Sequence, residues 1–380
     1  GRTPFSRNGD GRAALGPVLR EYIVSEAMHA LGVPTTRALA AVTTGEEVQR
    51  ERFLPGAVLA RVARSHIRVG TFQYFAARQD IEGLRLLADH VIDRHYPDAR
   101  EDPGPYLALL DAVIDAQASL VARWKLIGFI HGVMNTDNTS ICGETIDYGP
   151  CAFMDTYHPS TVYSSIDHGG RYAYANQAPI AHWNLAGFAQ TLIPLIDTDS
   201  AQSLELAQDR VNTFPAKFET AYNDGAREKL GLEINKQSDP TLMEELLATM
   251  AENQADFTLV FRRLSRLARD DDSLDDAVRE LFKDPAAFDQ WAVQWRARLR
   301  DEPRGELERC TQMQAINPAY IPRNHRVEEV IRAAEDNGSF GPFERLHEVL
   351  QKPFDEQQIN VEFQKPPQPE EIVQATFCGT

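Results

Sequence analysis

The apolar residues near the start of the chain recur with the spacing of an α-helix. Leu19, Ile23 and Ala27 lie four positions apart, and Gly32 ends the run. Residues that are three or four positions apart share one face of a helix. The pattern therefore predicts an amphipathic helix over residues 16 to 31.

Two short apolar stretches follow the predicted helix, at residues 38 to 43 and 57 to 62. A charged segment at residues 46 to 52 separates them, which is typical of two antiparallel strands joined by a turn. We therefore expect residues 1 to 69 to form a small lobe that contains strands.

Beyond residue 70 the apolar pattern is mainly helical. Helices are predicted at residues 84 to 95, 105 to 125, 184 to 198, 201 to 223, 240 to 252, 256 to 269, 273 to 282 and 285 to 300. The chain then becomes rich in proline, at Pro353, Pro366, Pro367 and Pro369, which predicts an irregular, extended tail. The sequence thus predicts an α+β fold, with a small lobe over residues 1–69, a large helical lobe over 70–350 and a tail over 351–380.

The composition of the chain argues against two classes of binding partner, nucleic acids and membranes. Of 380 residues, 39 are Lys or Arg and 56 are Asp or Glu, which gives a formal net charge of −17. This balance argues against the broad basic surface that nucleic acids require, so we expect no nucleic-acid partner. No run approaches ~18 uninterrupted apolar residues, so we expect no membrane partner. The four cysteines have no CxxC spacing and predict no structural metal site.

Two short motifs carry the candidate chemistry. The run HGVMNTDN occupies residues 131 to 138, and the triplet Asp-Tyr-Gly occupies residues 147 to 149. Protein kinases use an HRD-x-x-x-x-N loop and a DFG triplet to hold Mg²⁺ and a nucleoside triphosphate. By this spacing Asn138 and Asp147 are predicted metal ligands. The alternative is that the cluster is turn chemistry alone, because Asn and Asp readily bond local backbone.

The departure from the kinase pattern is equally informative. Val133 stands where a kinase keeps its catalytic Asp, and a valine cannot accept a proton. Asp137, directly before Asn138, still supplies a carboxylate beside the predicted metal site. His131 is predicted to hold the loop by hydrogen bonding, as the equivalent residue does in kinases.

Segments throughout the chain closely resemble the selenoprotein O family. They are GRTPFSR at residues 1 to 7, DGR at 10 to 12, RE at 20 to 21, SEAM at 25 to 28, GVPTTRA at 32 to 38, RVA at 61 to 63 and HGVMNTDN at 131 to 138. The resemblance implies a protein-kinase-like two-lobe fold, with a partial small N-lobe and a mainly helical C-lobe. It also implies an enzyme that binds ATP in a flipped orientation and transfers AMP to Ser, Thr or Tyr hydroxyls of proteins.

The family's functional residues can be matched to this chain. Asp137 resembles the proton acceptor, and Asn138 and Asp147 resemble the Mg²⁺ ligands. The residues that resemble nucleotide contacts are Asp10, Gly11, Arg61, Arg68 and Asp147. Glu21 resembles the helix glutamate that pairs with a nucleotide-binding lysine. The resemblance implies Mg²⁺ as the cofactor and ATP as the substrate, with Mn²⁺ and UTP used by some members.

Other expectations remain open at this point. The family's Gly-rich loop and lysine lie upstream of the position of Gly1, so we expect this chain to lack them and to be inactive alone or part of a longer protein. Without that lysine, Glu21 is expected to be unpaired or to contact Arg2, Arg7 or Arg12. Two other functions compete: a kinase that transfers the γ-phosphoryl group, and a nucleotide-binding scaffold without catalysis.

Cys378 falls where the family carries selenocysteine or cysteine, on a tail expected to be mobile. A redox role is therefore hypothesised, with a disulfide to Cys142 or Cys151. We expect a monomer in the cytoplasm of a bacterium, or in mitochondria if the source is eukaryotic.

Overall fold

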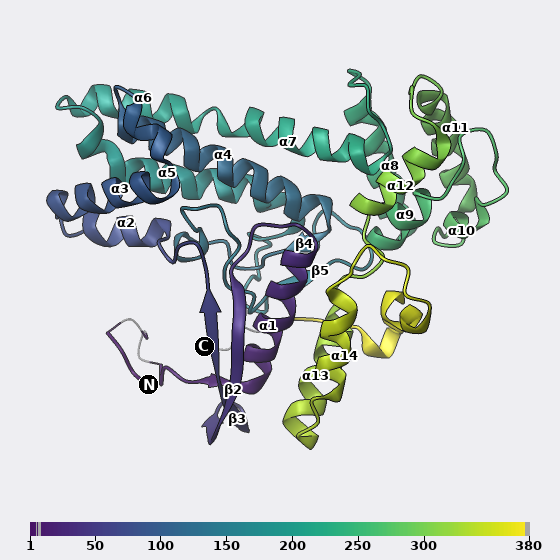
Figure 1. Ribbon diagram of the computed structural model, residues 1–380, viewed down its shortest axis with the longest axis horizontal. Helices are drawn as coiled ribbons and strands as arrows, with labels where there is room; N and C mark the ends of the chain where they lie inside the picture. The colour runs from purple at the N-terminus through teal and green to yellow at the C-terminus, as the bar shows by residue number, and fades with distance from the viewer. Residues whose placement is uncertain (5, 7–8, 377–380) are drawn as a thin grey trace.

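The computed structural model describes residues 1–4, 6 and 9–376 (Figure 1). The strands are β1 (Ala13–Ala14), β2 (Arg37–Gln49), β3 (Phe53–Val62), β4 (Phe129–Ile130) and β5 (Ala152–Phe153). The helices are α1 (Leu15–Ala30), α2 (Val69–Ala76), α3 (Ile81–His95), α4 (Pro105–Leu126), α5 (Gln177–Ile196), α6 (Ser200–Val211), α7 (Phe214–Lys229), α8 (Asp239–Asn253), α9 (Phe257–Leu264), α10 (Asp276–Arg279), α11 (Pro285–Leu299), α12 (Glu306–Ile316), α13 (Asn324–Asn337) and α14 (Gly341–Leu350). The predicted α+β fold with a small strand-containing lobe and a large helical lobe is confirmed.

The small lobe is built on a three-stranded antiparallel sheet in the order β1-β3-β2. The two predicted strands pair as expected, with Ala41 opposite Leu59. The charged segment predicted as a turn is partly strand, because the register shifts between Thr43 and Glu47 and pairing then resumes as far as Gln49. Val48 is buried in this resumed stretch, which explains why the strand continues.

Helix α1 packs against the sheet with the apolar face that the sequence predicted. Leu19, Ile23 and Ala27 are buried there in a core that also contains Val330 of α13 and Leu346 of α14. Figure 1 shows α13 and α14 beside α1. These two helices, which the sequence pattern did not reveal, therefore complete the core of the small lobe. The domain limits expected from the sequence remain a prediction.

The large lobe is centred on helix α4. Val113, Ile114 and Val121 of this helix are fully buried in a core shared with α5 and α6 (Figure 1). Among the described residues, α4 is the one helix long and apolar enough to cross a membrane by length and composition. Half of its apolar window (50%) is buried inside the molecule, as in the core helix of a globular protein.

Several predicted helix limits were wrong. The helix expected over residues 201 to 223 is two helices, because Pro215 in the first turn of α7 lacks the N–H that a continuous helix would need. The helix expected over 256 to 269 ends at Leu264, and that expected over 273 to 282 shrinks to the four residues of α10. Arginine–aspartate pairs fix the loop between them.

The tail runs along the body of the molecule. Arg323 at the start of α13 donates from Nε to the carbonyl oxygen of Gln364 at 2.9 Å. Further on, the Thr376 hydroxyl donates to the carbonyl oxygen of Pro150 at 2.5 Å, and its N–H donates to Tyr163 O at 2.8 Å. The described end of the tail is thus bonded next to the Asp-Tyr-Gly triplet.

Candidate active site

The loop of residues 131 to 138 is fixed by a buried histidine, as predicted. His131 Nε2 lies 2.9 Å from the carbonyl oxygen of Ile146, and its backbone N–H donates to Gln177 Oε1 at 3.0 Å. Burial lowers the pKa of the imidazole, which keeps the ring neutral. His131 therefore ties the loop to Ile146, directly before the Asp-Tyr-Gly triplet, and has a structural role.

The two predicted metal ligands meet in space. Asn138 Nδ2 donates to Asp147 Oδ2 at 2.8 Å and to the carbonyl oxygen of Val133 at 3.0 Å. Asp147 has a φ of +71°, a conformation that is uncommon outside glycine and that clusters at functional sites. The backbone is thus strained at the residue whose carboxylate faces Asn138.

Arg68 is brought to the same place by a short backbone pairing. Val69 N donates to Thr139 O and Ile141 N donates to Ile67 O, each at 3.0 Å, so the entry to α2 is bonded to the chain just after Asn138. The Nε of Arg68 is buried and has no hydrogen-bond partner among the described residues. A buried N–H without a partner is expensive, and an anion bound in the cleft would relieve that cost at Arg68.

Glu21 and Arg61 form an ion pair at the back of the site. Arg61 donates to Glu21 Oε2 at 2.8 Å, while Tyr148 N donates to Glu21 Oε1 at 2.6 Å. Burial raises the pKa of Glu21, and the charge of Arg61 opposes that shift. The expectation that Glu21 is unpaired was therefore wrong, since its partner is Arg61. Of the alternative partners that the sequence suggested, Arg7 lies outside the described residues. The missing signal was strand β3, which places Arg61 opposite α1.

Asp10 and Gly11 lie on the loop before β1. The Asp10 carboxylate pairs with Arg50 at 2.9 Å and accepts from Arg12 N at 3.0 Å, and these contacts lower its pKa to about 2. Gly11 has a φ of +65°, and a Cβ there would lie 2.1 Å from the carbonyl oxygen of Gly1. Asp10 thus orders the loop, and Gly11 lets the chain turn into the cleft.

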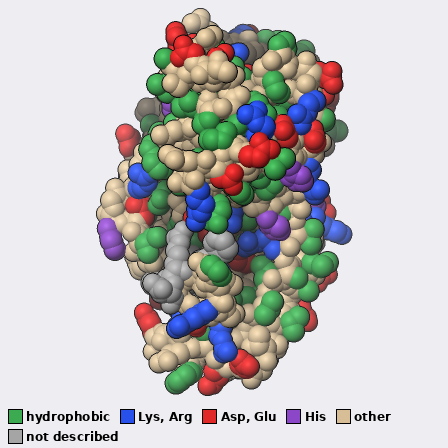
Figure 2. Space-filling model, turned by 90° about the vertical axis from the view of Figure 1, so that its left-hand side faces the viewer, with side chains coloured by type: hydrophobic (Ala, Val, Ile, Leu, Met, Phe, Trp, Pro, Cys, Tyr) green, Lys and Arg blue, Asp and Glu red, His purple; other side chains and the backbone are tan. Residues whose placement is uncertain are grey.

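Most of the predicted site residues line a cleft of about 700 Å³ between the two lobes. Its wall includes predicted residues, namely Gly11, Glu21, Arg61, Arg68, Asn138 and Asp147, and others that the sequence reasoning missed, among them Arg12, Val48, Ala57 and Leu59. Ala57, Leu59 and Arg61 lie two apart on β3, so strand alternation could have assigned the first two to the face of Arg61. Figure 2 shows a hollow between the lobes, with Lys and Arg side chains at its edge.

Two predicted residues lie elsewhere. Neither Asp10 nor Asp137 is in the wall of the cleft; Asp137 comes directly before Asn138, with its carboxylate against the first turn of α2. Cys378 lies outside the described residues.

The donor set suits a hard divalent cation. Mg²⁺ takes oxygen ligands and is commonly held by one or two protein groups together with phosphate oxygens and water. The carboxylate of Asp147 and the amide of Asn138 provide such oxygens on one wall of the cleft. Among the described residues, no group of three or more His, Cys, Asp or Glu could hold a metal alone. A cation here would therefore share its coordination with a bound phosphate.

A kinase-like two-lobe fold, in which Asn138 and Asp147 meet and valine stands where a kinase keeps its catalytic Asp, defines a nucleotide-dependent transferase of the pseudokinase type. Comparison with known proteins gives the particular family. A sequence profile described as protein adenylyltransferase SelO matches residues 1–351. The chain belongs to this enzyme family.

Curated relatives share most of the sequence. The protein nucleotidyltransferase YdiU of Rhodopseudomonas palustris (strain BisB5) is 62% identical over 380 residues, which are 100% of this chain and 77% of the relative. The proteins of the same name from Bradyrhizobium sp. (strain ORS 278) and from Methylorubrum extorquens are each 60% identical over 100% of this chain, covering 77% and 78% of the relatives.

Proposed function

We propose that this chain transfers AMP from ATP to Ser, Thr or Tyr hydroxyls of other proteins. The observation that carries the proposal is the convergence of Asn138 and Asp147, 2.8 Å apart, on a cleft that also holds the guanidinium of Arg68, whose buried Nε has no partner among the described residues. An amide and a carboxylate suit a divalent cation, and a guanidinium suits phosphate oxygens. Together they describe a triphosphate site.

The proposed chemistry is a displacement at the α-phosphorus. The acceptor hydroxyl oxygen bonds to that phosphorus, the bond to pyrophosphate breaks, and the hydroxyl proton passes to a base. Asp137 is the proposed base, since Val133 cannot take the proton and Asp137 directly precedes Asn138. Positioning and charge neutralisation supply most of the rate in such reactions.

The arginines of the cleft are proposed to hold the remaining phosphates. In a flipped ATP the γ-phosphate enters first, and it needs cationic partners at the back of the cleft. Arg61 is one candidate, and binding would draw it from Glu21, now at 2.8 Å. Arg68 is the other and has no ion pair to break among the described residues. Guanidinium groups bind phosphate oxygens in pairs, which favours arginine over lysine here.

Mg²⁺ is the proposed cofactor, held by Asn138 and Asp147, with Mn²⁺ as a substitute and UTP as an alternative substrate. The cation would neutralise charge that builds up on the phosphates. We further propose that the protein acts as a monomer in the bacterial cytoplasm, with no nucleic-acid or membrane partner.

Mass spectrometry of an acceptor protein tests the reaction. The full-length protein is incubated with ATP, Mg²⁺ and a mixture of acceptor proteins, and modified peptides are mapped. Added AMP supports the proposal, whereas added phosphate supports the competing kinase. If no peptide changes although labelled ATP binds, the protein is a nucleotide-binding scaffold. Parallel reactions with UTP and Mn²⁺ establish which nucleotide and metal are preferred.

Cys378 is proposed to form a reversible disulfide, and Cys151 is the better placed of its two candidate partners. Thr376 bonds to Pro150, the residue before Cys151. Burial raises the pKa of the Cys151 thiol, which disfavours the reactive thiolate, so the exchange would need a local opening. Non-reducing peptide mapping after oxidation with diamide tests this, and finding only free thiols would contradict it.

A further inference from the structure

Gly70 lies in the first turn of helix α2, directly after Val69, whose N–H donates to Thr139 O just beyond the loop of residues 131 to 138. Glycine is less favourable than alanine inside a helix by about 1 kcal/mol. Its backbone does not require glycine, because its φ is not in the positive range that side chains avoid. The absence of a side chain at this position needs another explanation.

The explanation is the carboxylate of Asp137. A Cβ at position 70 would lie 2.1 Å from Asp137 Oδ1 and 3.2 Å from its Cγ. Non-bonded heavy atoms pack at about 3.5–4.0 Å, so a methyl group and the carboxylate cannot occupy these positions together. The carboxylate is the far end of a flexible side chain, and it can rotate away. A side chain at position 70 would therefore turn the Asp137 carboxylate aside without unfolding the helix.

The backbone around Asp137 cannot move with it. Asp137 N donates to Asn135 Oδ1 at 2.9 Å, and Asn138 N donates to Asn135 O at 3.0 Å. The pairing of Val69 with Thr139 fixes the distance between α2 and this loop. Rotation of the Asp137 side chain is thus the available response to a larger residue at position 70.

We propose that Gly70 is a positioning residue for the proton acceptor, a role that rests on the proposed function of Asp137. The Asp137 carboxylate occupies the space next to the Gly70 Cα that a side chain would otherwise fill. Any larger residue displaces the base from the acceptor hydroxyl and leaves the nucleotide cleft intact, because Gly70 does not line that cleft.

The first test is Gly70→Ala in the full-length protein. A catalytic group that is displaced by about 1 Å loses roughly 10²-fold in rate, so kcat for AMP transfer should fall by about that factor. The KM for ATP and the melting temperature should stay at wild-type values. A wild-type kcat would overturn the proposal, as would a loss explained by weaker ATP binding.

Gly187→Ala is the matched control. Gly187 lies in helix α5, and its Cβ would meet the far end of Gln73 at 3.2 Å and Thr136 Cγ2 at 3.8 Å. It therefore adds a methyl group near the same loop without reaching the Asp137 carboxylate. This variant should keep the wild-type kcat; an equal loss would mean that any added bulk impairs the loop and would overturn the specific role of Gly70.

A second measurement separates this proposal from the proposed function. In an Asp137→Ala background the clash is absent, so Gly70→Ala should raise the melting temperature more than it does in the presence of Asp137. Equal shifts in the two backgrounds would overturn the contact. If wild-type protein transfers no AMP, the proposed function fails, but this comparison of melting temperatures still decides whether Gly70 and Asp137 interact.

Discussion

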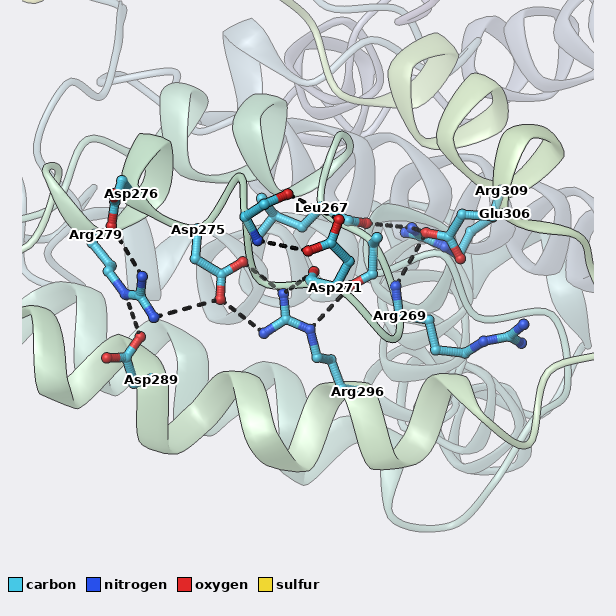
Figure 3. A network of polar contacts seen from close by, with 12 residues as sticks. Leu267, Arg269, Asp271, Asp275, Asp276, Arg279, Asp289, Arg296, Glu306 and Arg309 are labelled. Carbon is cyan, nitrogen blue, oxygen red and sulfur yellow. Dashed lines mark hydrogen bonds and ion pairs between the residues drawn. The ribbon is translucent and has the colours of Figure 1, made fainter.

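Arg68 of the nucleotide cleft and the arginines of the distal α9–α11 network are bonded very differently. In the distal network (Asp271, Asp275, Asp276, Arg279, Asp289 and Arg296), Arg296 donates to both oxygens of Asp275, at 2.6 and 2.9 Å, and to two carbonyl oxygens. Figure 3 shows Arg279 bridging Asp276 and Asp289 beside it. In the cleft, by contrast, the buried Nε of Arg68 has no partner among the described residues.

The difference separates structural from functional charges. A guanidinium whose N–H groups are nearly all bonded holds a loop in place, and the distal network does this for the loop between α9 and α10. A guanidinium in a cleft whose buried N–H has no partner has lost its hydrogen bonds to water. A bound anion would replace those hydrogen bonds. The same residue type thus stabilises a loop in the distal network, whereas the open Arg68 side chain supports the proposed binding of an anion in the cleft.

The largest expected effect is at the metal position of the cleft. Asp147→Asn keeps a residue type that tolerates positive φ but removes the charge that would face the proposed cation. AMP transfer should fall by at least about 10²-fold, the loss typical of removing one electrostatic group from an active site. Transfer of radiolabelled AMP measures the activity, and thermal unfolding measures the stability. A large drop in melting temperature with unchanged transfer would reverse the assignment of Asp147.

Breaking the distal network should lower the stability of the protein and leave its transfer activity unchanged. Arg296→Ala leaves the buried Asp275 carboxylate with Arg279 alone, at 3.8 Å, so the free energy of unfolding should fall by about 3 kcal/mol. Transfer by the folded protein should be unchanged below the melting temperature. Denaturant titration measures the loss. The control is Arg300→Ala, which removes an exposed pair with Asp270 and should cost less than about 1 kcal/mol.

Lys229 differs from the distal arginines because its hydrogen bond is to a neutral amide and not to a carboxylate. Its buried Nζ donates to the neutral amide of Asn317 at 2.7 Å, and burial lowers its pKa to about 7. The ring of Phe261, 4.2 Å from Nζ, opposes this shift by favouring the ammonium form. Between pH 7 and 10 the unfolded chain binds more protons at this residue, so the stability should rise with pH.

The expected gain is on the order of a few kcal/mol over that range. Lys229→Met should remove this part of the pH slope, measured by urea unfolding at several pH values. An unchanged slope would mean that Lys229 titrates as an ordinary lysine.

The sequence predicted the fold class and the two loops that meet, but it did not predict the contacts between distant elements. The spacing of Asn138 and Asp147 was sufficient to predict that they meet, because two short loops carry both side chains. The pairing of Glu21 with Arg61 was not predicted, since it depends on how strand β3 crosses helix α1. Helices α13 and α14 were missed for a similar reason. Their apolar faces pack on α1, which lies some 300 residues earlier in the chain. Local patterns thus predict motifs, whereas contacts between distant segments need the folded chain.

The smallest predicted effect tests the open arginine itself. Arg68→Ala removes a cation that has no ion pair among the described residues, so the melting temperature should not fall. A hydrogen bond to a charged group contributes about 1.5–3 kcal/mol, so ATP binding should weaken by roughly 10- to 100-fold. Calorimetric titration with ATP measures the affinity.

Arg64→Ala is the control for this last comparison. Arg64 is exposed and is not in the wall of the cleft, so its loss changes the net charge equally but should leave ATP affinity almost unchanged. Equal weakening by both substitutions would mean that ATP responds to overall charge and that the open guanidinium of Arg68 makes no direct contact. Loss of stability in Arg68→Ala would instead place Arg68 with the structural arginines of the distal network.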